Sequence, residues 1–226
     1  MRRPPASWRS VVPSAVRQAK PRRARHVEHA DRAEGRVLPT GREQEAKKMD
    51  TLWIRPIEIP ADGEALERLD TGLMTDRVYD VAVDDDGFHL RAHQVPPVTK
   101  RYPLEDWREP TPPWEVGWLA WREGRPVGFA AVRFERWNRR LVIWHLYVDR
   151  PARRSGVARA LLETATDWGR RRGAHTAWLE VSTVNYPAVQ AYRALGYQLS
   201  GLDLTLYRGT DAAGEAALFM TKSLQP

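Results

Sequence analysis

Apolar and polar positions alternate most clearly in residues 141–174, where they predict a strand, a basic turn and a helix. Residues 141–148 carry branched and aromatic side chains, and the run stops at an Asp-Arg-Pro sequence, as expected of a buried strand. Beyond the turn, apolar residues recur at helical spacing while charged residues fill the other faces. The recurring apolar residues are Val157, Leu161, Ala165 and Trp168.

Shorter patterns on either side of this unit predict further strands and helices. The predicted strands are 52–57, 77–83, 88–91, 114–120, 127–134 and 175–182, with two more around a turn at 209–214. The predicted helices are 60–69 and a second one from Asn185 to Gly196, and residues 96–113 are predicted to be a proline-rich loop. This order predicts a mixed α/β sheet, with ligands bound at the carboxyl ends of the strands that precede helices.

The predicted strand 175–182 has two chemically different faces. Alternation places Trp178, Glu180 and Ser182 on one face and small or branched residues on the other. Because the branched face belongs to the core, the face of Glu180 must turn either to solvent or to a cleft.

Residues 1–48 differ in composition from the rest of the chain. They hold 13 of the 36 Lys and Arg residues but 5 of the 29 Asp and Glu residues, a net charge of +8, and the remainder is close to neutral at −1. With few large apolar residues and repeated prolines, the segment is expected to lack a fold of its own. An anion-binding arm, a targeting peptide and an upstream reading frame are alternative interpretations, and we favour the third, with Met49 as the start of a domain spanning 49–226.

Composition excludes several classes of function. The chain has no cysteine, so it forms no disulfide, no thiolate metal site and no acyl-cysteine intermediate. No apolar run reaches the roughly 18 residues of a membrane span, and no secretory signal is visible, so we predict a cytoplasmic protein that binds neither membrane nor nucleic acid. His89 and His93 lie in a predicted strand-to-loop segment, where their spacing does not converge on a metal; we predict no metal site.

The basic turn at residues 153–156, just before the helix predicted within residues 141–174, is suited to binding phosphate. Arg153, Arg154 and Arg159 surround Gly156, where the first helical turn exposes unpaired N–H groups and the positive end of its dipole. The alternative is a basic loop that only caps the helix.

Two segments resemble the GNAT N-acetyltransferases. Arg153-x-x-Gly156-x-Ala158 after a strand is similar to the acyl-CoA signature of that family, and Leu179-Glu180-Val181 followed by Asn185 and Tyr192 is similar to its strand–helix signature. The resemblance implies a mixed, mostly antiparallel sheet with helices on both faces and a central cleft between two splayed parallel strands. It also implies that acetyl-CoA is the cosubstrate. The residues implied to contact it are Leu146, Tyr147, Val148, Arg153, Arg154, Ser155, Gly156, Val157, Ala158, Arg159, Asn185 and Tyr192.

The resemblance assigns chemistry to two residues. It implies that Tyr192 protonates the departing thiolate, which is reasonable because a phenol of pKa about 10 can donate to a thiolate of pKa about 8.5. The alternative is a packed helical tyrosine whose hydroxyl has a structural partner. Glu180 is the candidate base for the attacking amine; it could instead only bind a cationic substrate and leave deprotonation to water, and His145 is a further contender.

A wider resemblance, over residues 52–223, is to the streptothricin N-acetyltransferases of this family. It is most evident in the tail, at Gly201-Leu202-Asp203-x-x-Leu206-Tyr207 and Glu215-x-Ala217-Leu218-Phe219-Met220. It implies direct transfer of an acetyl group to a primary amine on the β-lysine part of a small cationic antibiotic, by a monomer or homodimer. The alternatives are acetylation of a peptide N-terminus or another small amine, and an acyl-CoA sensor without catalytic activity.

Overall fold

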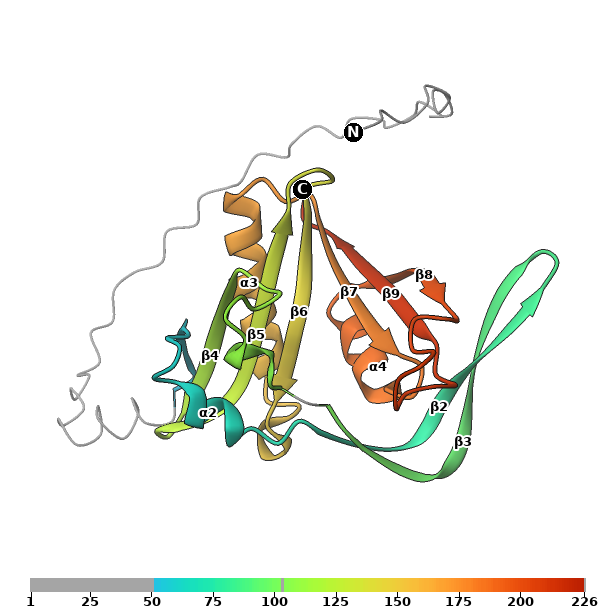
Figure 1. Cartoon of the computed structure of the whole chain (residues 1–226), viewed down its shortest axis with the longest axis horizontal. Helices are drawn as coiled ribbons and strands as arrows, with labels where there is room; N and C mark the ends of the chain where they lie inside the picture. Colours follow the sequence, from blue (N-terminus) through green and yellow to red (C-terminus); the bar gives the residue numbers. More distant parts are fainter. Residues whose placement is uncertain (1–50, 103, 226) are drawn as a thin grey trace, which may run out of the picture. The chain divides into compact units, whose positions relative to one another are not determined.

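A seven-stranded sheet is the central element of the computed structural model, which describes residues 51–102 and 104–225. Its order is β1-β4-β5-β6-β7-β9-β8, and every neighbouring pair is antiparallel except β6 and β7 (Figure 1). This confirms the predicted mixed, mostly antiparallel sheet. The strands are β1 (Trp53–Pro56), β4 (Val116–Arg122), β5 (Arg125–Glu135), β6 (Arg140–Val148), β7 (Thr176–Ser182), β8 (Gln198–Asp203) and β9 (Ala217–Ser223). The predicted leader and the boundary at Met49 lie outside the described residues.

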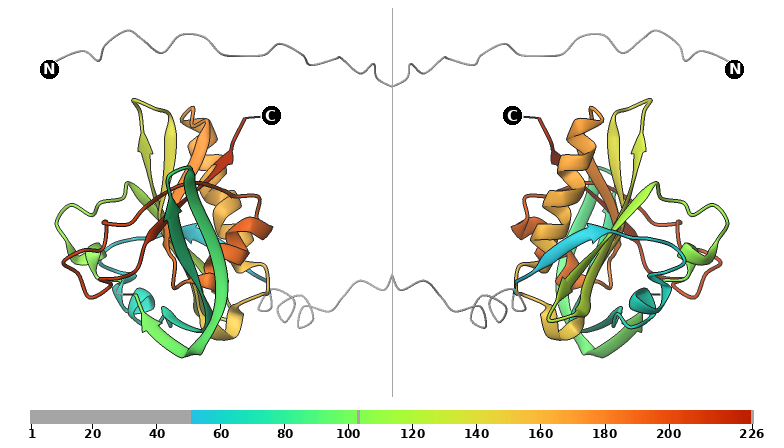
Figure 2. Two further views of the ribbon diagram at one scale, coloured as in Figure 1. Left: turned by 90° about the vertical axis from the view of Figure 1, so that its right-hand side faces the viewer. Right: turned by 90° about the vertical axis from the view of Figure 1, so that its left-hand side faces the viewer.

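Helices cover both faces of the sheet, as predicted. On one face, α3 (Val157–Arg171) and α4 (Tyr186–Ala194) pack on a core that includes Leu141, Leu161 and Leu179, all at most 1% exposed. On the other face, α2 (Gly63–Glu67) and a short 3-10 turn, η1 (Asp106–Arg108), pack on Phe129 in a second cluster. Figure 2 shows the two layers on opposite sides of the strands. A second 3-10 turn, η2 (Arg150–Ala152), connects β6 to α3.

Strands β6 and β7 separate after a short region of pairing. They are paired only at three positions, from Arg140 opposite Thr176 to Val142 opposite Trp178. Just beyond, β6 carries a bulge: Val132 and Ala131 of β5 face Ile143 and His145, which leaves Trp144 as the extra residue. A bulge bends its strand and increases the local twist, so β6 turns away from β7 at this point. The two strands then diverge towards their carboxyl ends (Figure 1).

A long hairpin lies outside the main sheet and corrects one prediction. β2 (Gly72–Asp84) pairs with β3 (Gly87–Arg101), so residues 96–101 are strand and the predicted proline-rich loop begins only after them. Pro96 and Pro97 are tolerated because they fall where the register shifts, in a ribbon with no third strand. Tyr79 anchors the hairpin to α4, since its hydroxyl lies 2.6 Å from Gln190 Nε2 and 3.0 Å from Arg193 Nη1.

Close packing between β5 and α3 depends on Gly128. A Cβ atom there would lie 2.9 Å from the Tyr147 carbonyl oxygen, 2.9 Å from Val157 Cγ1 and 3.0 Å from Leu161 Cδ1. The absent side chain therefore allows the beginning of α3 to approach β5.

We expect Gly128→Ala to destabilise the protein by about 1–3 kcal/mol, because a methyl group would overpack this contact and the carbonyl cannot move freely. Chemical denaturation monitored by tryptophan fluorescence measures the change. Gly201→Ala is the matched control, since its Cβ would meet only Phe219, at 3.5 Å. Equal stability of the two variants would contradict this packing argument.

Candidate active site

The first turn of α3 offers an uncapped helix N-terminus beside the end of β6. Gly156 occupies the N-cap position with φ of 87°, and no side chain caps the helix. Nothing lies within 4 Å of where its Cβ would be, so the space in front of the turn is open. Ser155 does not reach into that space, because its hydroxyl donates to the Ala152 carbonyl oxygen at 2.7 Å. The free N–H groups of the turn fit a phosphate group.

The three arginines of this turn have different roles in the structure. Arg153 binds main-chain oxygens, with its guanidinium 2.6 Å from the Gly72 carbonyl oxygen and 3.1 Å from that of Val148. It therefore braces the turn against β2. Arg154 and Arg159 are exposed and form no ion pair within the described residues, which leaves their charges available to an anionic ligand.

The divergence from β7 leaves one edge of β6 without a strand partner. Beyond Val142, β6 is paired only with β5, at Leu146 with Ala130 and at Val148 with Gly128. Apart from the Val148 carbonyl oxygen, which Arg153 holds, the main-chain groups on the edge facing β7 have no strand partner and can bind an extended ligand that carries amides. The bulge also reorients the side chains, since Leu146 and Val148 pack on the α3 core while Tyr147 packs on the opposite cluster.

Glu180 lies on the face of β7 that was predicted to be polar, and Ala177, Leu179 and Val181 face the core. The Tyr207 hydroxyl donates a hydrogen bond to Glu180 Oε1. Burial raises the pKa of Glu180, and Glu215 nearby acts in the same direction, whereas the hydrogen bond from Tyr207 and the charge of Lys100 oppose the rise. Glu180 is thus a half-buried carboxylate whose charge depends on its neighbours.

Residues distant in the sequence complete the surroundings of Glu180. Glu215 accepts a hydrogen bond from the Ser182 hydroxyl and forms an ion pair with Lys100, Nζ to Oε1 at 2.5 Å. Lys100 comes from the end of β3, and Tyr207 and Glu215 from the segment between β8 and β9. Sequence reasoning missed the role of these three residues; the similarity of the tail to one enzyme group was the only signal for Tyr207 and Glu215.

Tyr192 and Asn185 lie on α4, beside the end of β7. Tyr192 contacts Tyr197, with ring centroids 5.8 Å apart, and its hydroxyl has no hydrogen-bond partner in the part of the chain that the structure describes. Burial raises the pKa of Tyr192, and neighbouring groups that include Tyr147 and Glu180 raise it further, so the phenol keeps its proton at neutral pH. Asn185 caps the helix, its Oδ1 accepting from the Ala188 N–H at 3.2 Å. The structural alternative for Tyr192, a hydroxyl with an internal partner, is therefore not what the described residues show.

His145 is bound to a carboxylate on the β6 side. Its Nε2 lies 2.7 Å from Asp106 Oδ2, and its ring lies 5.5 Å from that of Tyr147. Burial of Asp106 opposes its charge, but His145 and the indoles of Trp114 and Trp144 together lower its pKa below the ordinary value. This contact fixes η1 against β6 and occupies one ring nitrogen of His145, so the other ring nitrogen can still accept a proton.

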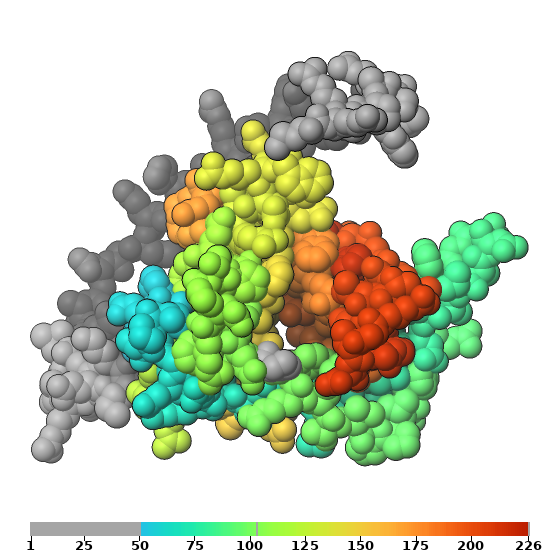
Figure 3. Space-filling model, viewed as in Figure 1, coloured from blue at the N-terminus to red at the C-terminus, as the bar shows by residue number. Residues whose placement is uncertain are grey.

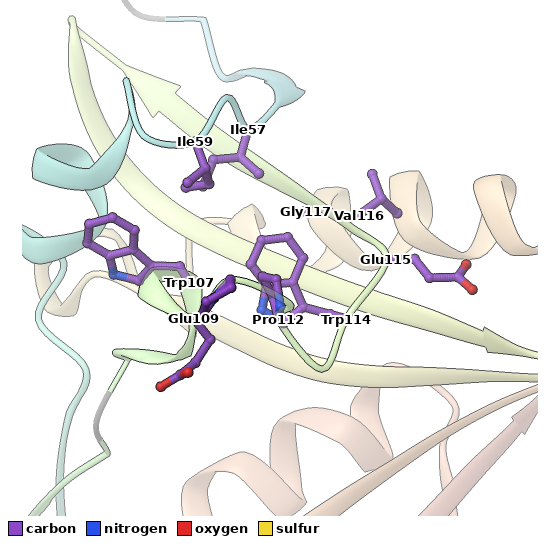
Figure 4. A pocket seen from close by; sticks show the side chains of 10 residues that line it. Ile57, Ile59, Trp107, Glu109, Pro112, Trp114, Glu115, Val116 and Gly117 are labelled. Carbon is purple, nitrogen blue, oxygen red and sulfur yellow. The ribbon is translucent and has the colours of Figure 1, made fainter.

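The surface is recessed between β6 and the β7–β9 half of the sheet in the space-filling view of Figure 3. A separate pocket of about 400 Å³ lies against η1 and β4, with walls that include Ile57, Trp107 and Trp114 (Figure 4). Neither Glu180 nor Tyr192 lines that pocket. We therefore place the candidate site in the opening between β6 and β7.

Residues 51–102 and 104–225 contain no group of three or more His, Asp or Glu side chains able to hold a metal ion. His89 instead contacts Asp84, Nε2 to Oδ2 at 2.8 Å, and His93 contacts Asp80 at 3.1 Å. No helix in this part of the chain is long and apolar enough to cross a membrane.

Comparison with known proteins identifies this arrangement. Residues 77–197, more than half of the chain, match the acetyltransferase (GNAT) family. The chain belongs to this family. It is therefore an acetyltransferase, and its cosubstrate is acetyl-CoA. Tyr207 and Glu215 lie outside the matched residues.

Relatives of this GNAT acetyltransferase include two streptothricin acetyltransferases. The Streptomyces lavendulae enzyme is 41% identical over 170 residues, covering 72% of this chain and 90% of the relative. The Escherichia coli enzyme is 32% identical over 131 residues, covering 58% of this chain and 73% of the relative.

Solved structures show the same fold. The crystal structure of nourseothricin acetyltransferase has a TM-score of 0.69 and 41% identity, covering 77% of this chain and 99% of that one. A Bacillus anthracis protein described as a streptothricin acetyltransferase and solved with acetyl coenzyme A has a TM-score of 0.66. At 21% identity, over 76% of this chain and 99% of that one, it shows the fold alone.

We expect Gly156→Asp to raise the KM for acetyl-CoA by about tenfold or more, because it places a negative charge at a phosphate site. Gly156→Asn is the matched control: it carries the same backbone cost at positive φ without the charge. Isothermal titration calorimetry with coenzyme A gives the affinities directly. If the Asp and Asn variants bind equally well, the turn does not contact phosphate.

Proposed function

We propose that this acetyltransferase modifies a primary amine on the β-lysine part of streptothricin-class antibiotics. Transfer takes place directly, in a ternary complex with acetyl-CoA. The observation that carries the proposal is the position of Glu180, a half-buried carboxylate held by Tyr207 on the strand face that borders the β6–β7 opening. The absence of cysteine removes the acyl-cysteine route and supports direct transfer.

The β6 side of the opening binds the cosubstrate. The first turn of α3, with Gly156, Val157 and Ala158, binds the pyrophosphate of the cosubstrate through its N–H groups, and Arg154 and Arg159 add positive charge. The free edge of β6 at Leu146, Tyr147 and Val148 binds the pantetheine arm. When bound, acetyl-CoA supplies an activated thioester.

Two side chains move protons. Glu180 accepts a proton from the substrate ammonium, directly or through a water, so that the amine nitrogen can attack the thioester carbonyl. Tyr192 donates its phenolic proton to the sulfur as the carbon–sulfur bond breaks, and the second proton that the nitrogen loses on becoming an amide restores the phenol, directly or through water. A raised pKa suits Glu180 to this role, because a more basic carboxylate is a stronger proton acceptor.

The acidic character of the β7 side supports a cationic acceptor. Within the described residues, Glu180 and Glu215 contribute two negative charges there and Lys100 contributes one positive charge. The pocket is therefore net negative and attracts an ammonium group. The identity to streptothricin acetyltransferases over most of the chain supports the same class of antibiotic.

The test is acetyl-CoA turnover against a panel of amines, with mass spectrometry of the products. The panel contains streptothricin, an aminoglycoside, free lysine and a peptide with N-terminal alanine. We expect streptothricin to give the highest kcat/KM and a product heavier by one acetyl group on β-lysine. Preference for the peptide would instead support N-terminal acetylation, and cofactor binding without turnover on any amine would contradict the proposal.

Tyr192→Phe separates catalysis from packing, because it removes only the hydroxyl. We expect kcat to fall by about 10²–10⁴-fold, the range for loss of a general acid, with little change in melting temperature or coenzyme affinity. Tyr197→Phe is the matched control: its hydroxyl also has no hydrogen-bond partner in the described structure, but we assign it no chemistry. Equal kcat values for the two variants would leave Tyr192 without a catalytic role.

The raised pKa of Glu180 predicts a pH dependence of kcat/KM. Only the carboxylate form accepts a proton, so activity rises with pH through the pKa of Glu180, above the range of an exposed glutamate. We call this rise of kcat/KM on the acidic side of the profile the acidic limb. Glu180→Gln should lose the acidic limb along with most of the activity. A limb that persists in the residual activity of Glu180→Gln would assign the titration to another group.

A further inference from the structure

The ion pair between Lys100 and Glu215 lies beside Glu180 but is built from two segments that are remote from it in sequence. Lys100 Nζ is 2.5 Å from Glu215 Oε1, and the side chains are 23% and 15% exposed. The other Glu215 oxygen accepts a hydrogen bond from the Ser182 hydroxyl. Both oxygens of Glu215 are thus held, one by a cation and one by a residue two positions from Glu180 on β7.

Lys100 and Glu215 act on Glu180 with opposite signs. The positive charge of Lys100 favours the ionised form of Glu180, and the negative charge of Glu215 disfavours it. The remaining titratable neighbours are tyrosines whose pKa is raised by burial, so they are uncharged at neutral pH. These neighbours are Tyr102, Tyr147, Tyr192 and Tyr207. Among the described residues, the charge balance at Glu180 is therefore set by Lys100 and Glu215.

We propose that Lys100 and Glu215 form a charge-balancing pair, in which Lys100 offsets the opposition of Glu215 to the ionised form of Glu180 and the acceptor pocket keeps one net negative charge. The two residues are positioning residues and take no part in bond making. The inference rests on the proposed role of Glu180 as the base. It deepens that role by assigning acceptor selection to the pair: a pocket with one net negative charge favours one ammonium group at the reacting position.

A purely structural role for the pair makes a different prediction. Lys100 links the end of β3 to the segment before β9, and this link alone would stabilise the fold. Loss of either partner would then lower the melting temperature, with no directed effect on the pH profile. Opposite pH shifts in the two single variants cannot result from a structural link.

The experiment measures the pH profile of kcat/KM for the best amine of the panel in a double-mutant cycle. Lys100→Met leaves the charge of Glu215 uncompensated, so the acidic limb should move to higher pH. Glu215→Gln leaves Lys100 uncompensated, so the limb should move to lower pH while the KM for the cationic amine rises by about fivefold or more. The double variant should bring the limb back towards its wild-type position, because the two charges are removed together.

Two controls and one fallback measurement make the outcome decisive. Lys100→Arg keeps the charge and should preserve the limb. Arg68→Met changes the net charge equally at an exposed ion pair with Glu64 and should leave the limb in place. If Lys100→Met does not fold, Glu215→Gln alone must still move the limb to lower pH.

The result that overturns the inference is a limb that disappears in Glu180→Gln but does not move in opposite directions in the two single variants. Persistence of the limb in Glu180→Gln is a different failure, because it removes the proposed base itself.

Discussion

The structure depends on the short parallel pairing of β6 and β7. Three paired positions, from Arg140–Thr176 to Val142–Trp178, hold the two halves of the sheet together, and the bulge at Trp144 then turns β6 away. Longer pairing would cover the edge of β6 and bury the face of Glu180. Shorter pairing would remove the continuous core that α3 and α4 share. The proposed active site is a consequence of where this pairing stops.

The two sides of the opening carry different electrostatics. The β6 side leads to the uncapped start of α3, where N–H groups and exposed arginines suit an anionic cosubstrate. The β7 side carries Glu180 and the Lys100–Glu215 pair, which suit a cationic amine. In the proposed function, the fold brings an anionic cosubstrate and a cationic amine together from opposite sides of the β6–β7 opening.

Local patterns were sufficient for the elements on which the site is built. The period of two predicted which face of β7 carries Glu180, and the glycine in the basic turn predicted the start of α3. The contacts that tune Glu180 could not be predicted, because Tyr207 and Lys100 reach it across long stretches of chain with no local signal. The prediction ended the strand that corresponds to β3 too early, at residue 91, and there is a physical reason. Prolines usually end strands, but a two-stranded ribbon with a register shift accommodates them.

The central claim is that both substrates occupy the β6–β7 opening at once. The most direct measurement is binding of a bisubstrate analogue in which coenzyme A is joined through an acetyl bridge to the β-lysine amine of streptothricin. The account predicts competitive inhibition against both acetyl-CoA and the antibiotic, with an affinity at least 100-fold above that of coenzyme A, on the order of the gain expected from linking two ligands. An analogue that binds no more tightly than coenzyme A and does not compete with the antibiotic would contradict it.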